Sequence, residues 1–398
     1  MRRFSNNWLF LTGGCSVPDC YPLKRSEVAT LQRNSFKVKA FQYALRFANV
    51  LSLLPNKLVP PPVRMIKIGS AYWQSRALYV ATELGVADAI GDETIVSDEI
   101  AEELNLHGDY LYRLLRMLAS IGVFEECDER CFRNNKRSHC LRTDSPQSVR
   151  EMVLLHNSPE MSRPWFEALG PALRSGEVPF MQSHGEELFD YLDHYSEFDA
   201  LFAGAMESVE SLTGTDYLDD FDWSRFERLV DIGGSNGSKA LAILKRHPQM
   251  HALVFDRPQV TENAVAYWRD RVDAELLARV SFAGGDMLET IPAAHSDSDI
   301  FLFFAIFHGM GDTQAEKILT NLRMACSSYR PTIAIIDCVA EAQRINPAVA
   351  SFDMQMLIGT RGRERTENEW RTLLARGGFM LQEIVSLRTF ARLLVVNF

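Results

Sequence analysis

The segment LVDIGGSNGSKALAIL, residues 229–244, carries the strongest fold signal in the chain. Its apolar start predicts a buried strand that ends near Asp231, and Gly233, Gly234 and Gly237 follow before a helical segment. Glycines let the backbone turn tightly and approach a ligand closely, and the N-terminus of the next helix favours polar or anionic groups. The acid precedes the glycines, where it suits a cationic ammonium group, and the loop lacks a Walker A lysine. The segment therefore predicts a strand–loop–helix unit that binds a nucleoside-containing ligand.

Two further elements follow the next two predicted strands. Asp256 ends the run ALVFD about 20 residues beyond the glycine loop, the spacing of an acid that bonds ribose hydroxyls. Gly284-Gly285-Asp286-Met287 ends the following run, and a carboxylate beside a flexible thioether suits an adenine amine and its ring face. Ligands of open α/β sheets bind at the carboxyl ends of the strands, so these elements together predict one nucleoside site.

Strand and helix patterns alternate from Phe226 to the C-terminus. This alternation predicts an α/β domain over residues 226–398, with a parallel, doubly wound sheet wrapped by helices. Strands are expected at Leu229–Ile232, Ala252–Phe255, Val280–Phe282, Ile300–Phe307, Thr332–Ile336 and Leu393–Val396.

Residues 1–62 are predicted to be an N-terminal extension and linker. An amphipathic helix is expected between Phe41 and Leu54, ended by Pro55, and the run Pro60-Pro61-Pro62 is expected to form a stiff linker. The segment fits a partner-binding arm, a mobile extension, or a translation start set upstream of Met65.

Residues 63–145 have the pattern of a winged helix-turn-helix: two apolar helical stretches, a short break and a charged wing. A DNA-binding regulator with a nucleoside-sensing domain is one interpretation. However, the second helical stretch carries only Arg113 and Arg116 as cations and offers a large apolar surface. We therefore favour a dimerisation domain over a nucleic-acid partner.

Residues 146–225 are predicted to be a helical linker rich in aromatic and Met side chains. Such side chains suit either core packing or the wall of an apolar ligand pocket. The candidates for a substrate pocket from the whole chain are Trp165, Phe202, Met206, Met310, Phe352 and Met356.

Composition excludes several classes of protein. The 398 residues include 42 Lys+Arg and 52 Asp+Glu, a net charge of −10, and 46% are hydrophobic. This composition excludes disorder as the main state of the chain and disfavours generic nucleic-acid binding. No run approaches the about 18 apolar residues of a membrane span. The seven cysteines are irregularly spaced, which indicates free thiols in the cytoplasm. Cys127, Cys131, His139 and Cys140 could hold zinc, but their spacing favours an ordinary charged wing, so no metal is expected.

Together these motifs resemble those of the small-molecule O-methyltransferases of plants and microbes, the caffeate and acetylserotonin type. The resemblance runs from about Met65 to Phe398. It is carried by YLYRLLRMLASIGVF, VDIGGSNGS, LVFDRPQV, GGDM, FFAIFHGMGD and GRERTENEW. It implies a class I methyltransferase domain with a Rossmann-like sheet, S-adenosyl-L-methionine as cofactor, and a homodimer formed through a mostly α winged-helix dimerisation domain.

The resemblance also implies the roles of individual residues. His308 is the expected catalytic base at the end of the fourth strand, with Asp337 and Glu364 as the acids that orient it. The expected cofactor-binding residues are Asp231, Gly233, Gly234, Gly237, Asp256, Asp286, Met287 and Phe304. The expected reaction is methylation of a hydroxyl on a small aromatic or polyketide-like secondary metabolite.

Two departures from the family pattern bear on this reaction. Gly309-Met310 replaces the usual Asp-Trp after the histidine, and Phe304 replaces a lysine often found four residues before it. Both changes make the surroundings of the histidine more apolar, which favours a bulky or hydrophobic acceptor. The alternative is a non-methylating relative, a pericyclase, dehydratase or hydroxylase that keeps S-adenosylmethionine as a structural or electrostatic element.

Overall fold

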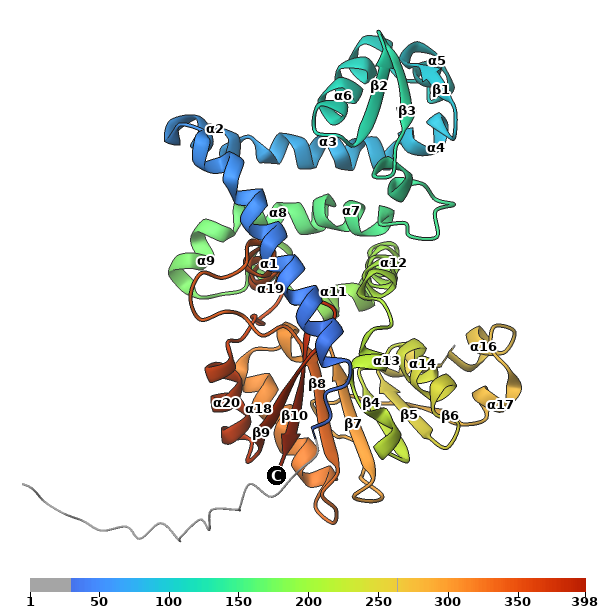
Figure 1. Ribbon diagram of the computed structural model, residues 1–398, viewed down its shortest axis with the longest axis vertical. Helices are drawn as coiled ribbons and strands as arrows, with labels where there is room; N and C mark the ends of the chain where they lie inside the picture. The colour runs from blue at the N-terminus through green and yellow to red at the C-terminus, as the bar shows by residue number, and fades with distance from the viewer. Residues whose placement is uncertain (1–29, 263) are drawn as a thin grey trace, which may run out of the picture. The chain divides into compact units, whose positions relative to one another are not determined.

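A seven-stranded sheet with the order β6-β5-β4-β7-β8-β10-β9 organises the C-terminal part of the chain (Figure 1). The computed structural model describes residues 30–262 and 264–398. The strands are β4 (Arg228–Ile232), β5 (His251–Asp256), β6 (Val280–Gly284), β7 (Asp299–Phe304), β8 (Thr332–Asp337), β9 (Met380–Ser386) and β10 (Arg392–Asn397). Since the chain moves outward from β4 in one direction to β5 and β6 and in the other to β7 and β8, the order reverses between β4 and β7. Ligands of open α/β sheets bind beside such a reversal.

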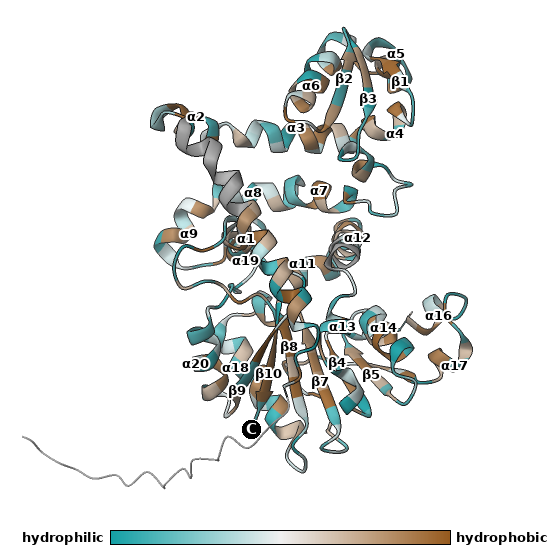
Figure 2. Cartoon of the chain, viewed as in Figure 1, coloured by the Kyte–Doolittle hydropathy of each residue, from teal (hydrophilic) through white to brown (hydrophobic). Residues whose placement is uncertain are grey.

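The sheet is mixed, which corrects the fully parallel arrangement predicted from the apolar runs. The strands from β6 through β8 pair in parallel, but β10 lies antiparallel to both β8 and β9. The prediction also missed β9, because its exposed and buried residues alternate instead of forming a continuous apolar run. Central strands are apolar along their length, as Figure 2 shows for β7, β8 and β10.

The fourth predicted strand is shorter than expected. We predicted that it runs to Phe307 and delivers His308 at its end, but β7 ends at Phe304. Ala305 takes a left-handed backbone with φ +55°, and Phe307–Gly309 then forms a 3₁₀ turn. Because a left-handed residue cannot continue a strand, the apolar Ile306 and Phe307 belong to the loop even though their composition suits a strand.

Helices flank the sheet and complete a buried core. In this part of the chain they are α14 (Ser238–Arg246), α15 (Pro258–Thr261), α16 (Ala264–Trp268), α17 (Ala274–Leu277), α18 (Asp312–Ala325), α19 (Pro347–Gly359) and α20 (Glu367–Arg376). Leu319 and Leu322 of α18 and Trp370 of α20 pack in one cluster with the inner residues of β4, β7 and β8. This core holds the strand ends and the loops that follow them in fixed positions.

A separate apolar cluster supports the predicted winged-helix segment. Leu111, Leu115 and Leu118 are buried on one face of its second helix, in agreement with the sequence pattern. Its elements are α3 (Ala71–Glu83), α4 (Val86–Ile90), β1 (Thr94–Val96), α5 (Ser97–Glu103), α6 (Gly108–Ser120), β2 (Phe124–Asp128) and β3 (Cys131–Asn134). The three strands form an antiparallel sheet in the order β1-β3-β2, which is the wing.

The proline-rich segment is helical, contrary to the predicted linker. Helix α1 (Ser35–Leu58) continues through Pro55, and α2 (Pro61–Gly69) begins within the proline run. Proline is favoured in the first turn of a helix, where its missing N–H has no intrahelical partner, so Pro61 starts a helix instead of stiffening a linker. The first 29 residues of the predicted extension lie outside the described residues.

The segment predicted to be a helical linker contains a series of helices. They are α7 (Arg150–Asn157), α8 (Pro159–Glu167), α9 (Leu169–Ser175), α10 (Pro179–His184), α11 (Leu188–His194), α12 (Ser196–Thr213) and α13 (Tyr217–Asp220). Within residues 30–262 and 264–398, every helix is too short or too polar to cross a membrane.

Candidate active site

The glycine loop follows β4 directly and adopts a backbone that requires glycine. Gly233 and Gly237 have φ of +71° and +84°, in the left-handed region that residues with a Cβ rarely occupy. The Gly233 N–H donates to the carbonyl oxygen of Phe255 at 2.7 Å, which holds the start of the loop against β5. Asp231, which is fully buried, precedes the loop within β4. The predicted strand–loop–helix unit is therefore present, with α14 beginning at Ser238.

Close contacts explain why the loop has no side chains at its glycines. A Cβ on Gly233 would lie 2.3 Å from Cδ1 of Ile306 and 3.3 Å from Cε of Met287. A Cβ on Gly234 would lie 2.7 Å from Cγ of Asp231. The structure thus brings the glycine loop, Met287 and the loop after β7 into contact. These are three of the segments that the sequence predicted to meet at the strand ends.

The two predicted acids differ in their surroundings. Asp256 Oδ2 accepts a hydrogen bond from the Ser235 N–H at 2.8 Å, and its Oδ1 accepts one from the Arg257 N–H at 2.7 Å. Asp256 therefore holds the glycine loop in place. The sequence predicted a contact with ribose for this residue and did not predict this structural role. Asp286 is exposed, and its Oδ1 accepts from the Leu288 N–H at 2.7 Å. A carboxylate oxygen has two lone pairs, so both acids keep capacity for a ligand.

Phe304 ends β7 beside a cation from another element. The Lys239 ammonium nitrogen lies 4.6 Å from the centre of the Phe304 ring, and the Tyr217 ring packs edge-on at 5.6 Å. A cation over an aromatic face is attracted by the ring quadrupole. We expected Phe304 to remove positive charge from this region, but Lys239 on α14 supplies a cation there.

His308 lies in the 3₁₀ turn and is held by two buried carboxylates. Its Nδ1 is 3.2 Å from Glu364 Oε1 and 3.9 Å from Asp337 Oδ1, and its backbone N–H donates to Asp337 Oδ2 at 3.1 Å. The Asp337 and Glu364 side chains are almost completely buried, whereas the imidazole is 16% exposed. With Nδ1–H donated to Glu364, the other ring nitrogen, Nε2, is the proton acceptor. The three residues that the resemblance implied are therefore brought together.

The surroundings of His308 and Asp337 raise the pKa of both side chains. Burial acts to lower the pKa of His308, but the Asp337 and Glu364 carboxylates outweigh it and raise the pKa above the ordinary 6.5. Burial also raises the pKa of Asp337 to about 6, although the charge of His308 opposes that shift. Both shifts favour the protonated forms of His308 and Asp337.

The donor atoms of His308, Asp337 and Glu364 lie within 4.8 Å of one another, a spacing that one metal ion could bridge. In the described structure, however, the contact between His308 Nδ1 and Glu364 has the geometry of a hydrogen bond. The cysteines at 127, 131, 140, 326 and 338 are free thiols. That the protein needs no metal stays a prediction.

The predicted pocket residues lie in different surroundings. The Phe352 ring lies 5.2 Å from the His308 ring, so α19 borders the histidine, and Met356 is on the same helix. Met310 packs against the sheet core, and Phe202 packs against Phe189 at 6.4 Å in a separate helical cluster. Trp165 and Met206 are partly exposed on α8 and α12. Of the six, the structure brings Phe352 into direct contact with the candidate base, and the pocket assignment of all six stays a prediction.

Three residues around the site were missed by sequence reasoning. Ile306 contacts the glycine loop, and the Trp268 indole N–H donates to the Asn236 carbonyl oxygen at 2.7 Å, which steadies that loop. The Arg365 guanidinium is buried and bonds the main chain of the turn that carries His308. The only available signal was for Arg365, which lies within GRERT next to Glu364.

Comparisons with known proteins agree with this geometry. One family model, an O-methyltransferase domain, matches residues 166–380, and another, an O-methyltransferase dimerisation domain, matches residues 66–144. The phenazine O-methyltransferase PhzM of Lysobacter antibioticus is 29% identical over 328 residues, which cover 82% of this chain and 93% of that protein. The phenazine-1-carboxylate N-methyltransferase of Pseudomonas aeruginosa is 32% identical over 334 residues, covering 83% and 96%.

A solved structure extends the similarity to the fold. CalO1, a methyltransferase in calicheamicin biosynthesis solved in its SAH-bound form, is 27% identical with a TM-score of 0.71. The match covers 84% of this chain and 97% of that chain. The sheet, the glycine loop and these matches together establish that this chain belongs to the O-methyltransferase family of methyltransferase enzymes.

Proposed function

We propose that the protein methylates a hydroxyl group on a small aromatic or polyketide-like metabolite, with His308 as general base. The observation that carries the proposal is the pairing of His308 Nδ1 with the buried Glu364, which directs the basic lone pair to Nε2. The turn that holds His308 begins beside Ile306, which contacts Gly233 of the glycine loop. The segment from Ile306 to His308 thus connects the proposed proton acceptor with the glycine loop.

The residues around the loop suit S-adenosyl-L-methionine. The left-handed backbone of Gly233 and Gly237 makes the tight turn after β4 that lets a main chain approach a nucleoside closely. Asp256 and Asp286 would bond its hydroxyl and amine groups, Met287 and Phe304 would border it, and Asp231 with Gly237 would shape the loop. When bound, this cofactor supplies an activated methyl group on a sulfonium.

The task of His308 is to accept the hydroxyl proton of the acceptor as the oxygen becomes nucleophilic. The imidazolium that forms is stabilised by Asp337 and Glu364, which also hold the ring in a fixed orientation. Because both carboxylates are buried, their field acts through a medium of low polarity and is little screened by salt. Much of the remaining acceleration comes from holding the acceptor in line for transfer.

The pH dependence of turnover tests the role of the base. We expect kcat to rise through an acid limb with a midpoint above pH 6.5, since His308 accepts a proton only when neutral and its pKa is raised. Replacement Asp337→Asn removes one source of that rise and is expected to move the limb to lower pH. Initial rates between pH 5.5 and 9 measure both, and a rate that stays constant across this interval would contradict the assignment.

The reaction itself is tested with labelled S-adenosylmethionine and a panel of phenolic acceptors that includes a hydroxyphenazine. Transfer of one methyl to oxygen with release of S-adenosylhomocysteine is the expected result. The relative from Pseudomonas aeruginosa is named as an N-methyltransferase, so amine acceptors belong in the panel and methylation of nitrogen alone would overturn the choice of oxygen. A changed acceptor that gains no methyl would support the non-methylating alternative.

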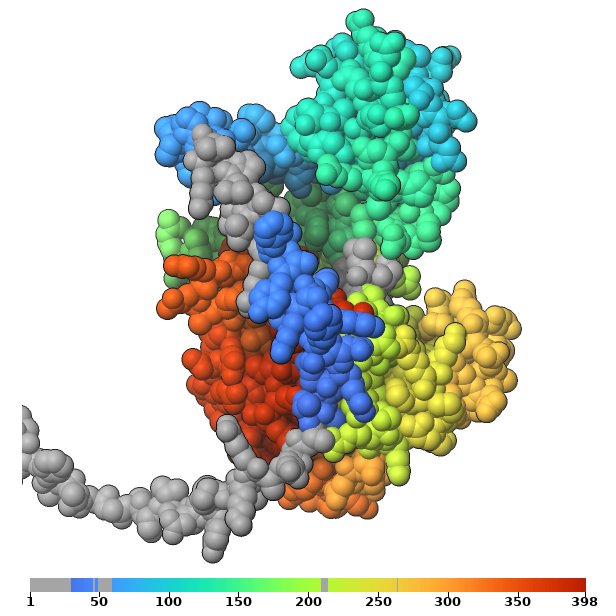
Figure 3. All heavy atoms as spheres, in the orientation of Figure 1, coloured from blue at the N-terminus to red at the C-terminus, as the bar shows by residue number. Residues whose placement is uncertain are grey.

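We also propose a homodimer formed through the N-terminal helices. Ile66 on α2 is 71% exposed and Trp73 on α3 is 66% exposed, and Met65, Ile68 and Tyr72 are exposed beside them. Figure 3 shows α2 and α3 at the surface, and the matched dimerisation domain begins at residue 66. An exposed apolar group of this kind is typical of an interface with another chain.

The dimer is tested by placing a charge on this face. We expect Ile66→Asp to convert the dimer to a monomer, because a carboxylate buried against apolar side chains loses its hydration without a partner. Light scattering after size exclusion measures the mass of the particle. Met380→Asp on the exposed face of β9 is the matched control and should remain dimeric. A dimeric Ile66→Asp variant would exclude α2 from the interface.

The remaining assignments are proposals of the same kind. We divide the chain into residues 1–62, 63–145, 146–225 and 226–398 as extension, dimerisation domain, helical linker and catalytic domain. A cytoplasmic location agrees with the free thiols of the described cysteines. Arg113 and Arg116 remain the only cations of α6, which supports a partner other than nucleic acid.

A further inference from the structure

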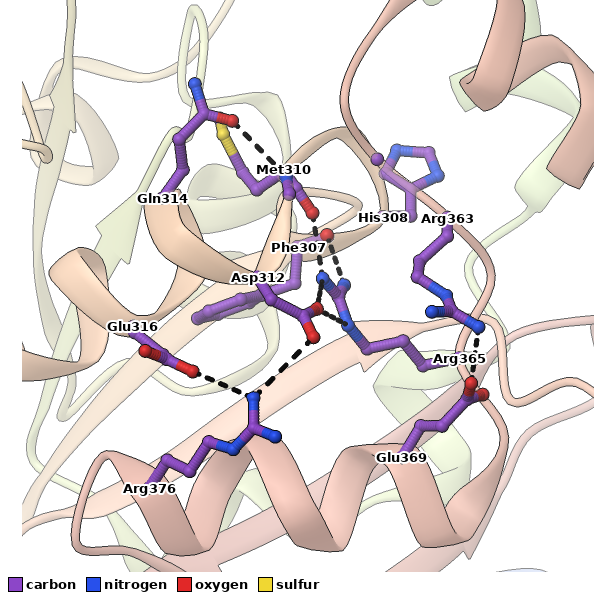
Figure 4. Close-up of polar contacts among 12 residues, drawn as sticks. Phe307, His308, Met310, Asp312, Gln314, Glu316, Arg363, Arg365, Glu369 and Arg376 are labelled. Atoms are coloured by element: carbon purple, nitrogen blue, oxygen red, sulfur yellow. Dashed lines mark hydrogen bonds and ion pairs between the residues drawn. The ribbon is translucent and has the colours of Figure 1, made fainter. Parts of the chain in front are cut away.

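Arg365 is a buried cation beside the turn that carries His308. The residue is 1% exposed, although a guanidinium is among the most costly groups to bury. Its Nη1 donates to the Phe307 carbonyl oxygen at 2.7 Å, and its Nη2 donates to the Met310 carbonyl oxygen at 2.8 Å. Figure 4 shows the guanidinium reaching both carbonyls and the carboxylate of Asp312.

The two carbonyls lie on either side of His308 in the chain. The guanidinium of Arg365 therefore holds the turn at both of its ends. Two hydrogen bonds from one rigid group suit the planar, forked guanidinium of an arginine. The neighbouring Gly309 has no side chain with which to brace the turn. The segment before Arg365 also packs closely against the turn. A Cβ on Gly362 would lie 1.9 Å from the His308 carbonyl oxygen.

Arg365 is itself anchored to the strand that ends in Asp337. Its carbonyl oxygen accepts a hydrogen bond from the Ala340 N–H at 2.9 Å, just beyond β8. Its neighbour Glu364 is the residue that holds His308 Nδ1. Consecutive residues of one segment thus hold the histidine ring and the histidine main chain.

The charge of Arg365 also acts on the catalytic cluster. Two buried carboxylates face one imidazole, so the cluster with a protonated His308 and both acids ionised carries a net negative charge. Arg365 lowers the pKa of Asp337 and so opposes the effect of burial. The carboxylate paired with Arg365, Asp312, is 47% exposed, so water screens it more than it screens Arg365.

We propose that Arg365 is a positioning residue that holds the His308 turn through its two carbonyl bonds and offsets the negative charge of the Asp337–Glu364 pair. This inference rests on the proposed role of His308 as the base. The other charged or titratable groups near the cluster are Asp353, which accepts from the Glu364 N–H, Cys338, Glu341 and Arg363. Arg363 is exposed and pairs with Glu369, so Arg365 is the buried cation beside the cluster.

The test compares three substitutions that separate position from charge. Arg365→Met removes the fork and the charge, Arg365→Lys keeps the charge but cannot bond both carbonyls, and Asp312→Asn keeps the fork and removes its exposed counter-charge. Arg376→Gln is the matched control, since Arg376 also faces Asp312 but is exposed and does not contact the turn. Each variant is examined for kcat, KM, the pH profile and cofactor affinity by calorimetry.

We expect Arg365→Met to lower kcat about tenfold or more and to move the acid limb to higher pH by about half a unit or more, since losing a nearby cation raises the proton affinity of the cluster. Arg365→Lys should lower kcat with little movement of the limb. Asp312→Asn should move the limb in the opposite direction, to lower pH, with kcat largely kept. Arg376→Gln should match the wild type, and cofactor affinity should change less than threefold in all four.

The His308 titration followed by NMR of labelled imidazole gives the same comparison without turnover. Opposite shifts of its pKa in Arg365→Met and Asp312→Asn would support the proposal even if no acceptor were methylated, which separates its failure from failure of the proposed function. If the His308 titration and the kcat profile are unchanged in both, the proposal is wrong. If Arg365→Met does not fold, Arg365→Lys decides, because it removes the paired carbonyl bonds, and an unchanged kcat in this variant overturns the proposal.

Discussion

Replacement of His308 by Ala is expected to lower kcat by about 10²-fold or more, the scale on which enzymes lose a general base. The acceptor hydroxyl would then lose its proton to water, without the Asp337 and Glu364 carboxylates to stabilise the charge. Cofactor affinity should stay within a few-fold of the wild type, because the glycine loop contacts Ile306 and not the imidazole. Initial rates with labelled S-adenosylmethionine and calorimetry of cofactor binding measure the two effects.

The substitution also leaves two buried carboxylates without their partner, so its effect on stability needs a control. His308→Gln keeps an N–H that can bond Glu364 but has no basic nitrogen, and it should be as inactive as His308→Ala with a smaller loss of melting temperature. His139→Ala, at an exposed histidine near the wing, should have no effect on rate. Unchanged turnover in His308→Ala would remove this residue from the mechanism.

Gly233→Ala is expected to weaken cofactor binding by about tenfold or more, equivalent to about 1.4 kcal/mol. The added Cβ would lie 2.3 Å from Cδ1 of Ile306, so either the loop or the turn leading to His308 must move. The alanine must also hold a left-handed φ of +71°, which costs about 1–2 kcal/mol. Calorimetry with S-adenosylhomocysteine measures the affinity and thermal unfolding measures the stability.

Gly176→Ala separates the cost of the left-handed backbone from the cost of the close contact with Ile306. Gly176 has φ of +75°, but a Cβ there would meet no atom within 4 Å. It should therefore lose a similar amount of stability through backbone strain and keep full cofactor affinity. Equal affinities in the two variants would show that the loop tolerates a side chain at Gly233 and that this part of the loop does not determine cofactor binding.

The central strands could be predicted because burial on both faces leaves a continuous apolar run in the sequence. The direction of β10 could not, since an apolar run is the same whether a strand pairs in parallel or antiparallel. β9 at the sheet edge alternates in burial and resembles many surface segments. The end of β7 was placed wrongly because the partly buried Ile306 and the buried Phe307 are covered by tertiary contacts and not by pairing in the sheet.

The candidate site divides in a similar way. The glycine loop and Asp256 lie within about 30 residues and follow rules of local backbone geometry, so their pattern alone indicated a nucleoside site. Asp337 and Glu364 were identified by family resemblance, because nothing local to either residue indicates a histidine partner far away in the chain. Lys239 and Phe304 are a further contact that the sequence did not predict. Phe304 in place of a lysine suggested that a cation is lost, but the fold places Lys239 of α14 beside the Phe304 ring.

The sequence by itself determined the α/β class, the glycine loop and the family, because these depend on periodicity and on conformations that only certain residues adopt. Only the tertiary structure decided how His308 is held. Its ring bonds Glu364 and its turn bonds Arg365, residues 56 and more positions further along the chain. Such contacts arise where β7, β8 and the segment before α20 end at the same edge of the sheet. Their strength depends on burial, which no stretch of sequence specifies on its own.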